Sequence, residues 1–296
     1  MKEGKEEQKN MKNKIVAIVI LMLVATTVVS ATNMNVKEKI QPTSVGADVP
    51  ILAVGDSWTY NERYINRGYT ENGTVWMLWY HNCTSTYTVT DDNGDNYTVK
   101  FTSTKNKGQL IWGTMRLKFT PFTKLTGEVI LRKTDLAYVS DSYTEKGFVF
   151  TLIWFGLPFP AQFSDIWGHS YTPPGIVFPF PLIAGTNGTL PNSSYMGHEK
   201  ISLYWGLIKM FDGDLSGYFG EQNYTCEMAN ITVPAGTYDT YNVSAESTPY
   251  GGYSSSWSYY APEAGWFVKQ YIYNEDENGR PGWIFECELV NTTYTP

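Results

Sequence analysis

Apolar and polar residues alternate along most of the chain beyond residue 50. Residues 115–120, Met-Arg-Leu-Lys-Phe-Thr, alternate strictly, and in residues 97–102 Tyr, Val and Phe alternate with Thr, Lys and Thr. Successive side chains of a β-strand point to opposite faces, so a period of two predicts strands with one buried and one solvated face. We therefore expect a mainly β protein.

Short polar segments with an Asn-Gly pair separate the predicted strands. Residues 91–95 lie between the alternating segments 84–90 and 96–102, and residues 276–279 separate another such pair near the carboxyl end. Asn-Gly favours tight hairpin turns. Hairpins in succession predict an antiparallel meander and not a parallel α/β sheet. Residues 199–211 fit a strand or a helix by periodicity, and the Tyr and Trp among them favour a strand.

The middle of the chain, residues 150–198, breaks the alternation. It is crowded with Pro, Phe, Trp and Gly, as in Leu157–Pro160 and Phe178–Pro181. Proline lacks an N–H group and fixes φ, so at this density it argues against central strands and helices. We expect a connecting segment that packs over the sheet, as a lid. It separates an N-terminal antiparallel β region at 50–149 from a C-terminal β region at 199–296.

The amino-terminal residues predict export. Residues 15–29 form an apolar run, which follows several lysines and ends in small residues that suit cleavage after Ala31. This pattern is typical of a secretory signal peptide at residues 1–31, and a polar tether at 32–49 follows it. An uncleaved membrane anchor is the alternative, because the hydropathies of the two overlap. We expect an extracellular or cell-surface protein that contacts a membrane only through this segment, if it stays uncleaved.

Composition narrows the class of partner. The formal net charge of the chain is −7, and the predicted signal segment holds more Lys than Glu, so its removal makes the remainder more negative. An acidic chain without basic clusters argues against nucleic acid and anionic membrane surfaces as partners. The 22 tyrosines and 10 tryptophans suit strands and apolar pockets better than helical bundles.

The three cysteines, Cys83, Cys226 and Cys287, leave two alternatives open. Cysteine pairs outside the cytoplasm are commonly oxidised. Cys226 and Cys287 each share the phase of apolar neighbours, so both are predicted on the buried face of their strands. A Cys226–Cys287 disulfide is one expectation and two free core thiols the other, since connectivity cannot be read from spacing.

Asn-x-Ser/Thr sequons predict a glycosylated exterior. Their number exceeds the roughly three or four that chance would give in a Thr-rich chain. Asn-rich loops in an unglycosylated protein are the alternative. The acceptor residues are Asn72, Asn82, Asn96, Asn187, Asn192, Asn223, Asn230, Asn242 and Asn291.

No arrangement of catalytic residues is recognisable. The histidines, His81, His169 and His198, lie in separate segments, and neither a Gly-x-Ser-x-Gly motif nor a Ser-x-x-Lys motif occurs. A pair of glycosidase carboxylates cannot be chosen from the acidic residues by sequence alone. We therefore expect no enzymatic activity and no cofactor.

One segment resembles half of a calcium-binding loop. Asp212, Asp214 and Ser216 place oxygen atoms at alternate positions, and Gly217 follows where such loops turn sharply. The twelfth position, where a bidentate Glu is usual, holds Asn223. Calcium is therefore one expectation, and a plain acidic turn is the alternative.

The last quarter of the chain resembles a known family. Residues 231–239, Ile-Thr-Val-Pro-Ala-Gly-Thr-Tyr-Asp, and residues 259–269, Tyr-Tyr-Ala-Pro-Glu-Ala-Gly-Trp-Phe-Val-Lys, resemble two elements of DUF3108-like exported proteins. A looser match lies at residues 55–58. The resemblance implies an open, strongly curved antiparallel sheet, similar to the half-barrel of LolA/LolB-type carriers that hold acyl chains on a concave face. Bacterial members lack this density of sequons, and the combination resembles archaeal proteins.

The same two elements have a local structural meaning. Gly236 stands where a tight turn needs a residue without Cβ. Pro262 and Gly265 bracket a second turn, after which Trp266 and Val268 re-enter the sheet.

The expected function follows from compartment, fold and aromatic content. We expect an exported binding protein that holds a lipid or another apolar molecule in a curved sheet, with Trp154 and Trp167 in contact with the ligand. A structural or carbohydrate-binding protein of the cell envelope, in contact with envelope glycan, is the alternative, and a hydrolase ranks below both. An enclosed apolar cavity would favour the first and a row of exposed Trp and Tyr the second.

Overall fold

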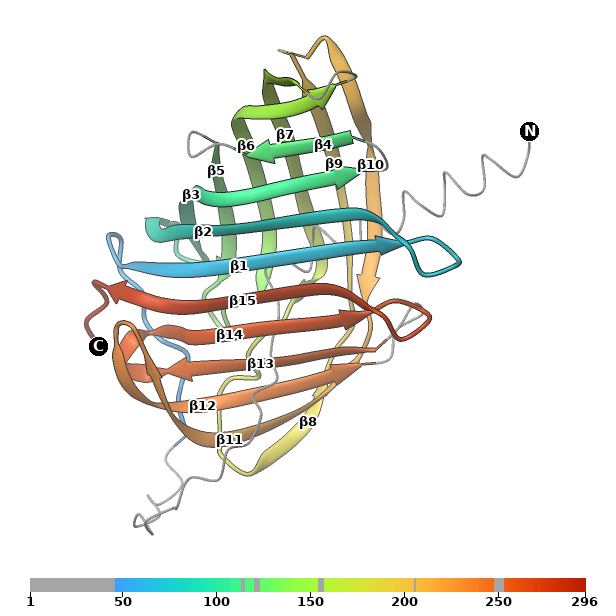
Figure 1. Ribbon diagram of the computed structural model, residues 1–296. Coiled ribbons are helices and arrows are strands. Elements are labelled where there is room, and N and C mark those ends of the chain that lie inside the picture. Colours follow the sequence, from blue (N-terminus) through green and yellow to red (C-terminus); the bar gives the residue numbers. More distant parts are fainter. Residues whose placement is uncertain (1–45, 113–114, 120–122, 154–156, 205, 248–252) are drawn as a thin grey trace.

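The computed structural model describes residues 46–296, apart from residues 113–114, 120–122, 154–156, 205 and 248–252. The expected signal peptide, most of the tether and Trp154 lie outside the described residues. The described chain forms strands and one short 3₁₀ helix, which confirms a mainly β protein (Figure 1). The strands are β1 (Ser57–Tyr69), β2 (Val75–Asp92), β3 (Asn96–Trp112), β4 (Met115–Phe119), β5 (Lys124–Arg132), β6 (Tyr138–Ile153), β7 (Leu157–Gly175), β8 (Thr186–Leu190), β9 (Ser193–Leu203), β10 (Ile208–Phe219), β11 (Gln222–Val233), β12 (Gly236–Ser247), β13 (Ser254–Ala261), β14 (Trp266–Glu275) and β15 (Pro281–Thr292).

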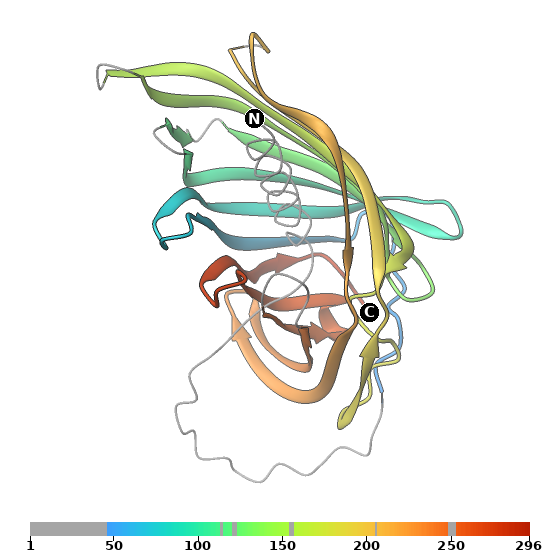
Figure 2. The ribbon, with the colours of Figure 1, turned by 90° about the vertical axis from the view of Figure 1, so that its right-hand side faces the viewer.

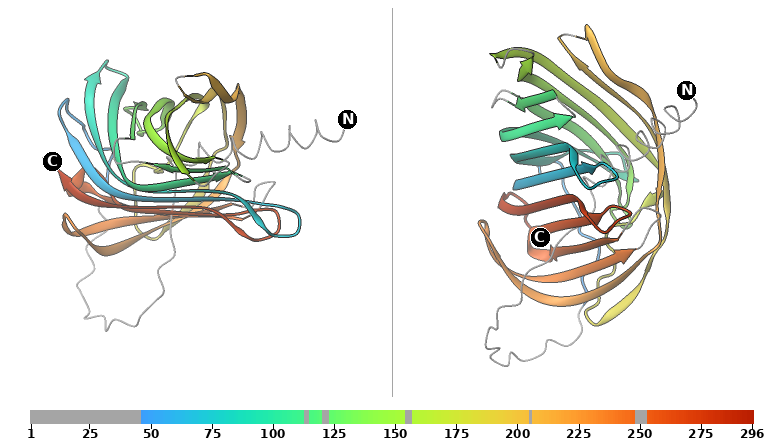
Figure 3. Two further views of the ribbon diagram at one scale, coloured as in Figure 1. Left: turned by 45° about the horizontal axis from the view of Figure 1, so that its top comes forward. Right: turned by 45° about the vertical axis from the view of Figure 1, so that its right-hand side comes forward.

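All the strands belong to one antiparallel sheet. Its order is β10-β9-β7-β6-β4-β3-β2-β1-β15-β14-β13-β12-β11-β8, and β5 pairs with β3 and β6 beside β4. The first and last strands of the chain pair in the middle of the sheet, where Trp58 lies opposite Thr292. The edge strands β10 and β8 are not paired with each other in the described chain, so the sheet is open. Figures 2 and 3 show that it bends strongly around a concave face, as expected.

The predicted hairpins are present. β2 and β3 pair up to Asp92 and Tyr97 on either side of the turn at 93–95, and β14 and β15 flank the turn at 276–280. Residues 199–211 continue strand β9, turn, and enter β10, so the preference for a strand is confirmed.

Both turns of the DUF3108-like segment form as expected. β11 ends at Val233 and β12 begins at Gly236. The 3₁₀ helix η2 (Pro262–Ala264) forms the second turn, and Gly265 ends it with φ of 64°. A Cβ at Gly265 would also come within 2.6 Å of the Tyr294 ring, so two separate constraints call for glycine there.

The expectation for residues 150–198 as a connector is wrong in its main part. This range contains all of β7, which lies inside the sheet between β6 and β9, as well as β8. The prolines are tolerated because of where they stand in the ladder. β9 pairs with β7 only between Phe163 and Thr172. Pro158 and Pro160 precede this range and Pro173 follows it, so each stands where β7 lacks this neighbour.

Residues 176–185 do pack against the sheet, as expected of the connector. The rings of Phe178 and Phe180 lie 5.6 and 5.2 Å from that of Tyr260 on β13. Leu182 forms a bridge with Ala47 just before β1. The segment therefore covers part of the sheet, but it contributes to the core and does not form a separate lid.

Candidate binding site on the concave face

The alternation in β1 places a carboxylate among aromatic residues. Trp58, Tyr60, Glu62 and Tyr64 are alternate residues and share the inner face of the strand. Trp58, Tyr60 and Tyr64 are almost fully buried, whereas Glu62 is partly exposed. The concave curvature brings strands that are not neighbours of β1 to this face. The Tyr60 hydroxyl donates a 2.7 Å hydrogen bond to the carbonyl of Phe267 on β14.

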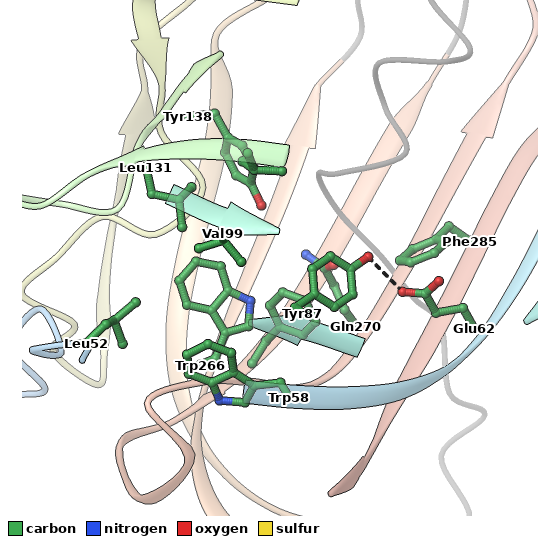
Figure 4. Close-up of a pocket in the computed structure, with 12 residues that line it drawn as sticks. Leu52, Trp58, Glu62, Tyr87, Val99, Leu131, Tyr138, Trp266, Gln270 and Phe285 are labelled. Carbon is green, nitrogen blue, oxygen red and sulfur yellow. Dashed lines mark hydrogen bonds between the residues drawn. The ribbon is translucent and has the colours of Figure 1, made fainter. Parts of the chain in front are cut away.

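A small cavity opens beside Glu62 on this face (Figure 4). Its volume is about 30 Å³, or about 520 Å³ when all space open to solvent is counted. The smaller volume is comparable to one or two water molecules. An acyl chain would not fit inside it. The lining residues are Leu52, Trp58, Glu62, Tyr87, Val99, Val129, Leu131, Tyr138, Trp266, Phe267, Gln270 and Phe285.

Three donors converge on the Glu62 carboxylate. Its Oε1 accepts a hydrogen bond from the Tyr87 hydroxyl at 2.9 Å, and its Oε2 accepts from the Ser85 hydroxyl and from the Cys83 thiol at 3.3 Å. Ser85 is in turn hydrogen-bonded to Ser103 at 2.5 Å. Burial raises the pKa of Glu62 and outweighs these hydrogen bonds, which lower it.

A ladder of packed rings, contributed by four strands, runs from the cavity. Ring centroids are 5.2 Å apart between Tyr87 and Phe101, 5.2 Å between Phe101 and Tyr143, and 5.0 Å between Tyr143 and Trp167. Phe101 and Tyr143 both pair with Gly127 of β5. A Cβ at Gly127 would lie 2.5 Å from the Phe101 ring, so the two rings can meet only over a glycine.

Beyond the ladder lies a group of buried carboxylic acids. Glu145 and Asp165 are cross-strand partners on β6 and β7, and Glu199 of β9 lies opposite Trp167. All three acids are at most 1% exposed. Both oxygens of Glu199 lack a hydrogen-bond partner, and burial raises its pKa to about 7. Tyr64 lies near this group. Burial is the main cause of its raised pKa, and the charges of Glu199 and Glu145 raise it further.

A second polar group on the same face consists of Asp141, His169 and Tyr171. The His169 Nδ1 atom lies 2.8 Å from Asp141 Oδ1, and the Tyr171 hydroxyl donates to Asp141 Oδ2. His169 Nε2 is buried without a hydrogen-bond partner. The group satisfies a buried carboxylate with two donors, as burial of a charge requires.

The expected calcium loop is not formed. Asp212, Asp214 and Ser216 lie within strand β10 and not in a loop, so their side chains follow an extended backbone. Asp212 Oδ1 and Asp214 Oδ1 lie 2.8 and 2.9 Å from the two ring nitrogens of His198 on β9, and Lys209 pairs with Asp212. The hydrogen bonds to Asp214 and Asp212 raise the pKa of His198. Within the described chain, no group of three His, Cys, Asp or Glu residues could hold a metal ion.

Comparisons with known proteins do not assign a family. No family model and no curated protein matches the chain. One solved structure that it resembles is described as a candidate exported protein with a YmcC-like fold, from Bacteroides fragilis NCTC 9343. That structure is 13% identical, the match covers 84% of this chain and 100% of the other, and the TM-score is 0.34. The resemblance to DUF3108-like and LolA/LolB-type proteins therefore stays a prediction.

The structure brings only part of the expected site together. Trp167 lies on the concave face, is 3% exposed and stacks on Tyr143, but it does not line the cavity. Cys226 and Cys287 are buried as expected, and their thiols are free, which agrees with the alternative of two core thiols and not with a Cys226–Cys287 disulfide. The Cys83 thiol forms no disulfide and donates to Glu62. Burial raises the pKa of the Cys226 thiol to about 11.

The sequons are accessible to different degrees. Asn82, Asn96 and Asn242 are half-buried. The Asn230 side-chain nitrogen donates a 2.8 Å hydrogen bond to Asp239. The fully exposed acceptors are Asn72, Asn187, Asn192, Asn223 and Asn291 together with Asn230. Glycosylation stays a prediction.

The polar residues of the concave face were missed in the sequence, although a signal exists. Glu62 stands at a position of β1 whose alternate neighbours, Tyr60 and Tyr64, are apolar. Glu199 of β9 likewise points to the same face as Ile201. A carboxylate in the apolar phase of an alternating strand contradicts simple burial and marks a site.

None of the described helical segments is long and apolar enough to span a membrane.

Proposed function

We propose that this chain is an exported binding protein that takes an amphipathic small molecule on its concave face. The observation that carries the proposal is the cavity beside Glu62, which combines an apolar, mostly aromatic lining with one carboxylate. Ligand sites are typically apolar hollows with a few placed polar groups, and they enclose roughly 300–1,000 Å³. The cavity has this composition, although its volume of about 30 Å³ is smaller than is typical.

A ligand of this type would place its polar head beside Glu62 and its apolar body against the rings of Trp58 and Trp266, which line the same cavity. A lipid is one molecule of this type, with most of its chain outside the cavity.

Export and glycosylation complete the proposal and rest on the sequence. The apolar run at residues 15–29 and the sequons support a protein that passes through a secretory route. The six exposed acceptor asparagines have the access to solvent that attachment of a glycan requires.

A carbohydrate platform is less well supported. Sugar-binding surfaces use exposed aromatic rings. Among the residues that the structure describes, no Trp or Tyr side chain is fully exposed; the exposed apolar ones are aliphatic or Phe. A structural role in the envelope and the lack of enzymatic activity both stay predictions.

The test is binding of N-phenyl-1-naphthylamine, a neutral probe whose fluorescence rises in apolar sites, to the secreted protein. Val129→Phe fills the cavity and should weaken binding about tenfold or more. Val75→Phe makes the same change at an exposed position and should leave it unaltered. Equal affinity in the three proteins, or no binding to the unaltered one, would refute the proposal.

A further inference from the structure

We infer that the head group taken by the cavity is cationic, so that the ligand is an apolar amine whose ammonium group lies against Glu62. The inference rests on the proposed function and specifies the chemical class of its ligand. It depends on three features of the described concave face: the donors around Glu62, the charge of the cavity and the rings beside it.

The donors around Glu62 fix it as an acceptor. Ser85, Cys83 and Tyr87 all direct hydrogens toward its oxygens. A carboxylate has about four acceptor sites and no donor, so three donors leave about one site for a ligand. A ligand that completes this set must itself donate. An ammonium group donates and also neutralises the charge, which a hydroxyl cannot do.

The charge of the cavity favours a cation as well. Glu62 is the one charged residue that lines it, and no Lys or Arg of the described chain is buried. Besides burial, the Glu62 charge is among the causes that raise the pKa of Tyr60, Tyr87 and Cys287. A low-dielectric hollow lined by one sign of charge attracts the opposite sign.

The rings supply the third feature. Trp58 and Trp266 line the cavity with ring centroids 5.9 Å apart (Figure 4). Tyr87 stacks on Phe101 and donates its hydroxyl hydrogen to Glu62. The faces of such rings attract cations within about 6 Å. The amide nitrogen of Gln270, which also lines the cavity, already donates a 3.1 Å hydrogen bond to Ser258. The lining therefore offers Glu62 and ring faces to an ammonium group, and apolar surface to the body of the amine.

The test compares three probes of similar shape at pH 7.4 by calorimetry: 2-phenylethylamine, 2-phenylethanol and 3-phenylpropanoate. The amine should bind about tenfold or more tightly than the alcohol, and the anion should bind most weakly. Glu62→Gln keeps the size and an acceptor oxygen, so it should abolish the preference for the amine and retain binding of the alcohol. Glu227→Gln changes an exposed residue of β11 and should preserve the preference.

A second readout separates charge recognition from a change of fold. Burial raises the pKa of Glu62 and a bound ammonium group lowers it, so amine binding should release protons over the pH range in which Glu62 titrates. Measurements in two buffers of different ionisation enthalpy count these protons, and Glu62→Gln should release none. Tyr87→Phe keeps the ring and removes one donor from Oε1, so the preference for the amine should rise, and a fall would contradict the inference.

The outcomes distinguish the two proposals. If the alcohol binds as well as the amine, or the anion binds best, the ligand is not a cation and the apolar binding function survives. If none of the three probes nor N-phenyl-1-naphthylamine binds, the proposed function fails and the inference fails with it.

Discussion

Replacement of Glu199 by Gln should stabilise the protein at high pH and leave its stability unchanged at low pH. The Glu199 carboxyl is fully buried on β9, and neither of its oxygens has a hydrogen-bond partner. Two acidic residues lie on the neighbouring strands, Asp165 on β7 and Glu145 on β6. His198 lies on the opposite face of β9 and lowers the pKa of Glu199 less than burial raises it. The protonated acid is therefore favoured in the folded state.

The magnitude follows from the difference between two pKa values. The pKa of Glu199 is about 7 in the folded state against 4.5 ordinarily. Because the folded state binds this proton more tightly, stability is lost as pH rises from about 4.5 through about 7, and it is constant above. The difference corresponds to about 3 kcal/mol. For a domain of this size that amounts to roughly 6–12 °C in Tm.

The assay is urea unfolding followed by tryptophan fluorescence at pH 5, 6, 7 and 8. The free energy of unfolding of Glu199→Gln minus that of the unaltered protein should grow from about 1 kcal/mol at pH 5 to about 3 kcal/mol at pH 8. Glu227→Gln, at an exposed position, should show no such growth. An equal effect of Glu199→Gln at pH 5 and pH 8 would refute the argument, as would a loss of stability at pH 8.

Two further predictions concern other parts of the sheet. The hydrogen bond to Asp214 is the first cause of the raised pKa of His198, so Asp214→Asn should lower that pKa, as followed by NMR titration. The stability that charged His198 contributes is present below its unfolded pKa of about 6.5 and is lost as pH rises through the raised value. A pKa of His198 that Asp214→Asn leaves unchanged would contradict the assignment. Gly127→Ala should lower the free energy of unfolding by about 1–3 kcal/mol, because the new methyl group meets the Phe101 ring and the Ser142 carbonyl. Gly282→Ala, whose methyl group finds only ordinary contacts, is the matched control, and equal melting of both variants would show that the rings can shift.

The elements of the fold that depend on local sequence were predictable. Period-two alternation located the strands, and Asn-Gly pairs located the turns at 93–95 and 276–280. The error at β7 has a physical cause: whether a proline is tolerated depends on where the neighbouring strand ends, and that is set by register with β9. Register is a property of two strands together and is absent from either one alone.

The candidate site was less predictable for a related reason. Glu62 is distinctive in sequence only as a carboxylate in the apolar phase of β1. Its partners Ser85 and Tyr87 come from β2, and Trp266 and Gln270 come from strands far along the chain. The choice between a disulfide and two free thiols stayed open for the same reason, because burial of Cys226 and Cys287 is a local property but the distance between them depends on the whole fold.

The pairing of β1 with β15 has a consequence for how the polypeptide acquires its shape during synthesis. Apart from β8, which pairs with β11 at one edge, the sheet consists of two consecutive meanders, and Trp58 and Thr292 meet along the line that joins them. Until the last strand has been made, β1 is an uncovered edge, with free backbone donors and acceptors of the kind that recruit other chains. Contacts between residues so far apart in the chain form slowly. Completion of the sheet, and with it of the hollow between Trp58 and Trp266, therefore waits for the final residues of the chain.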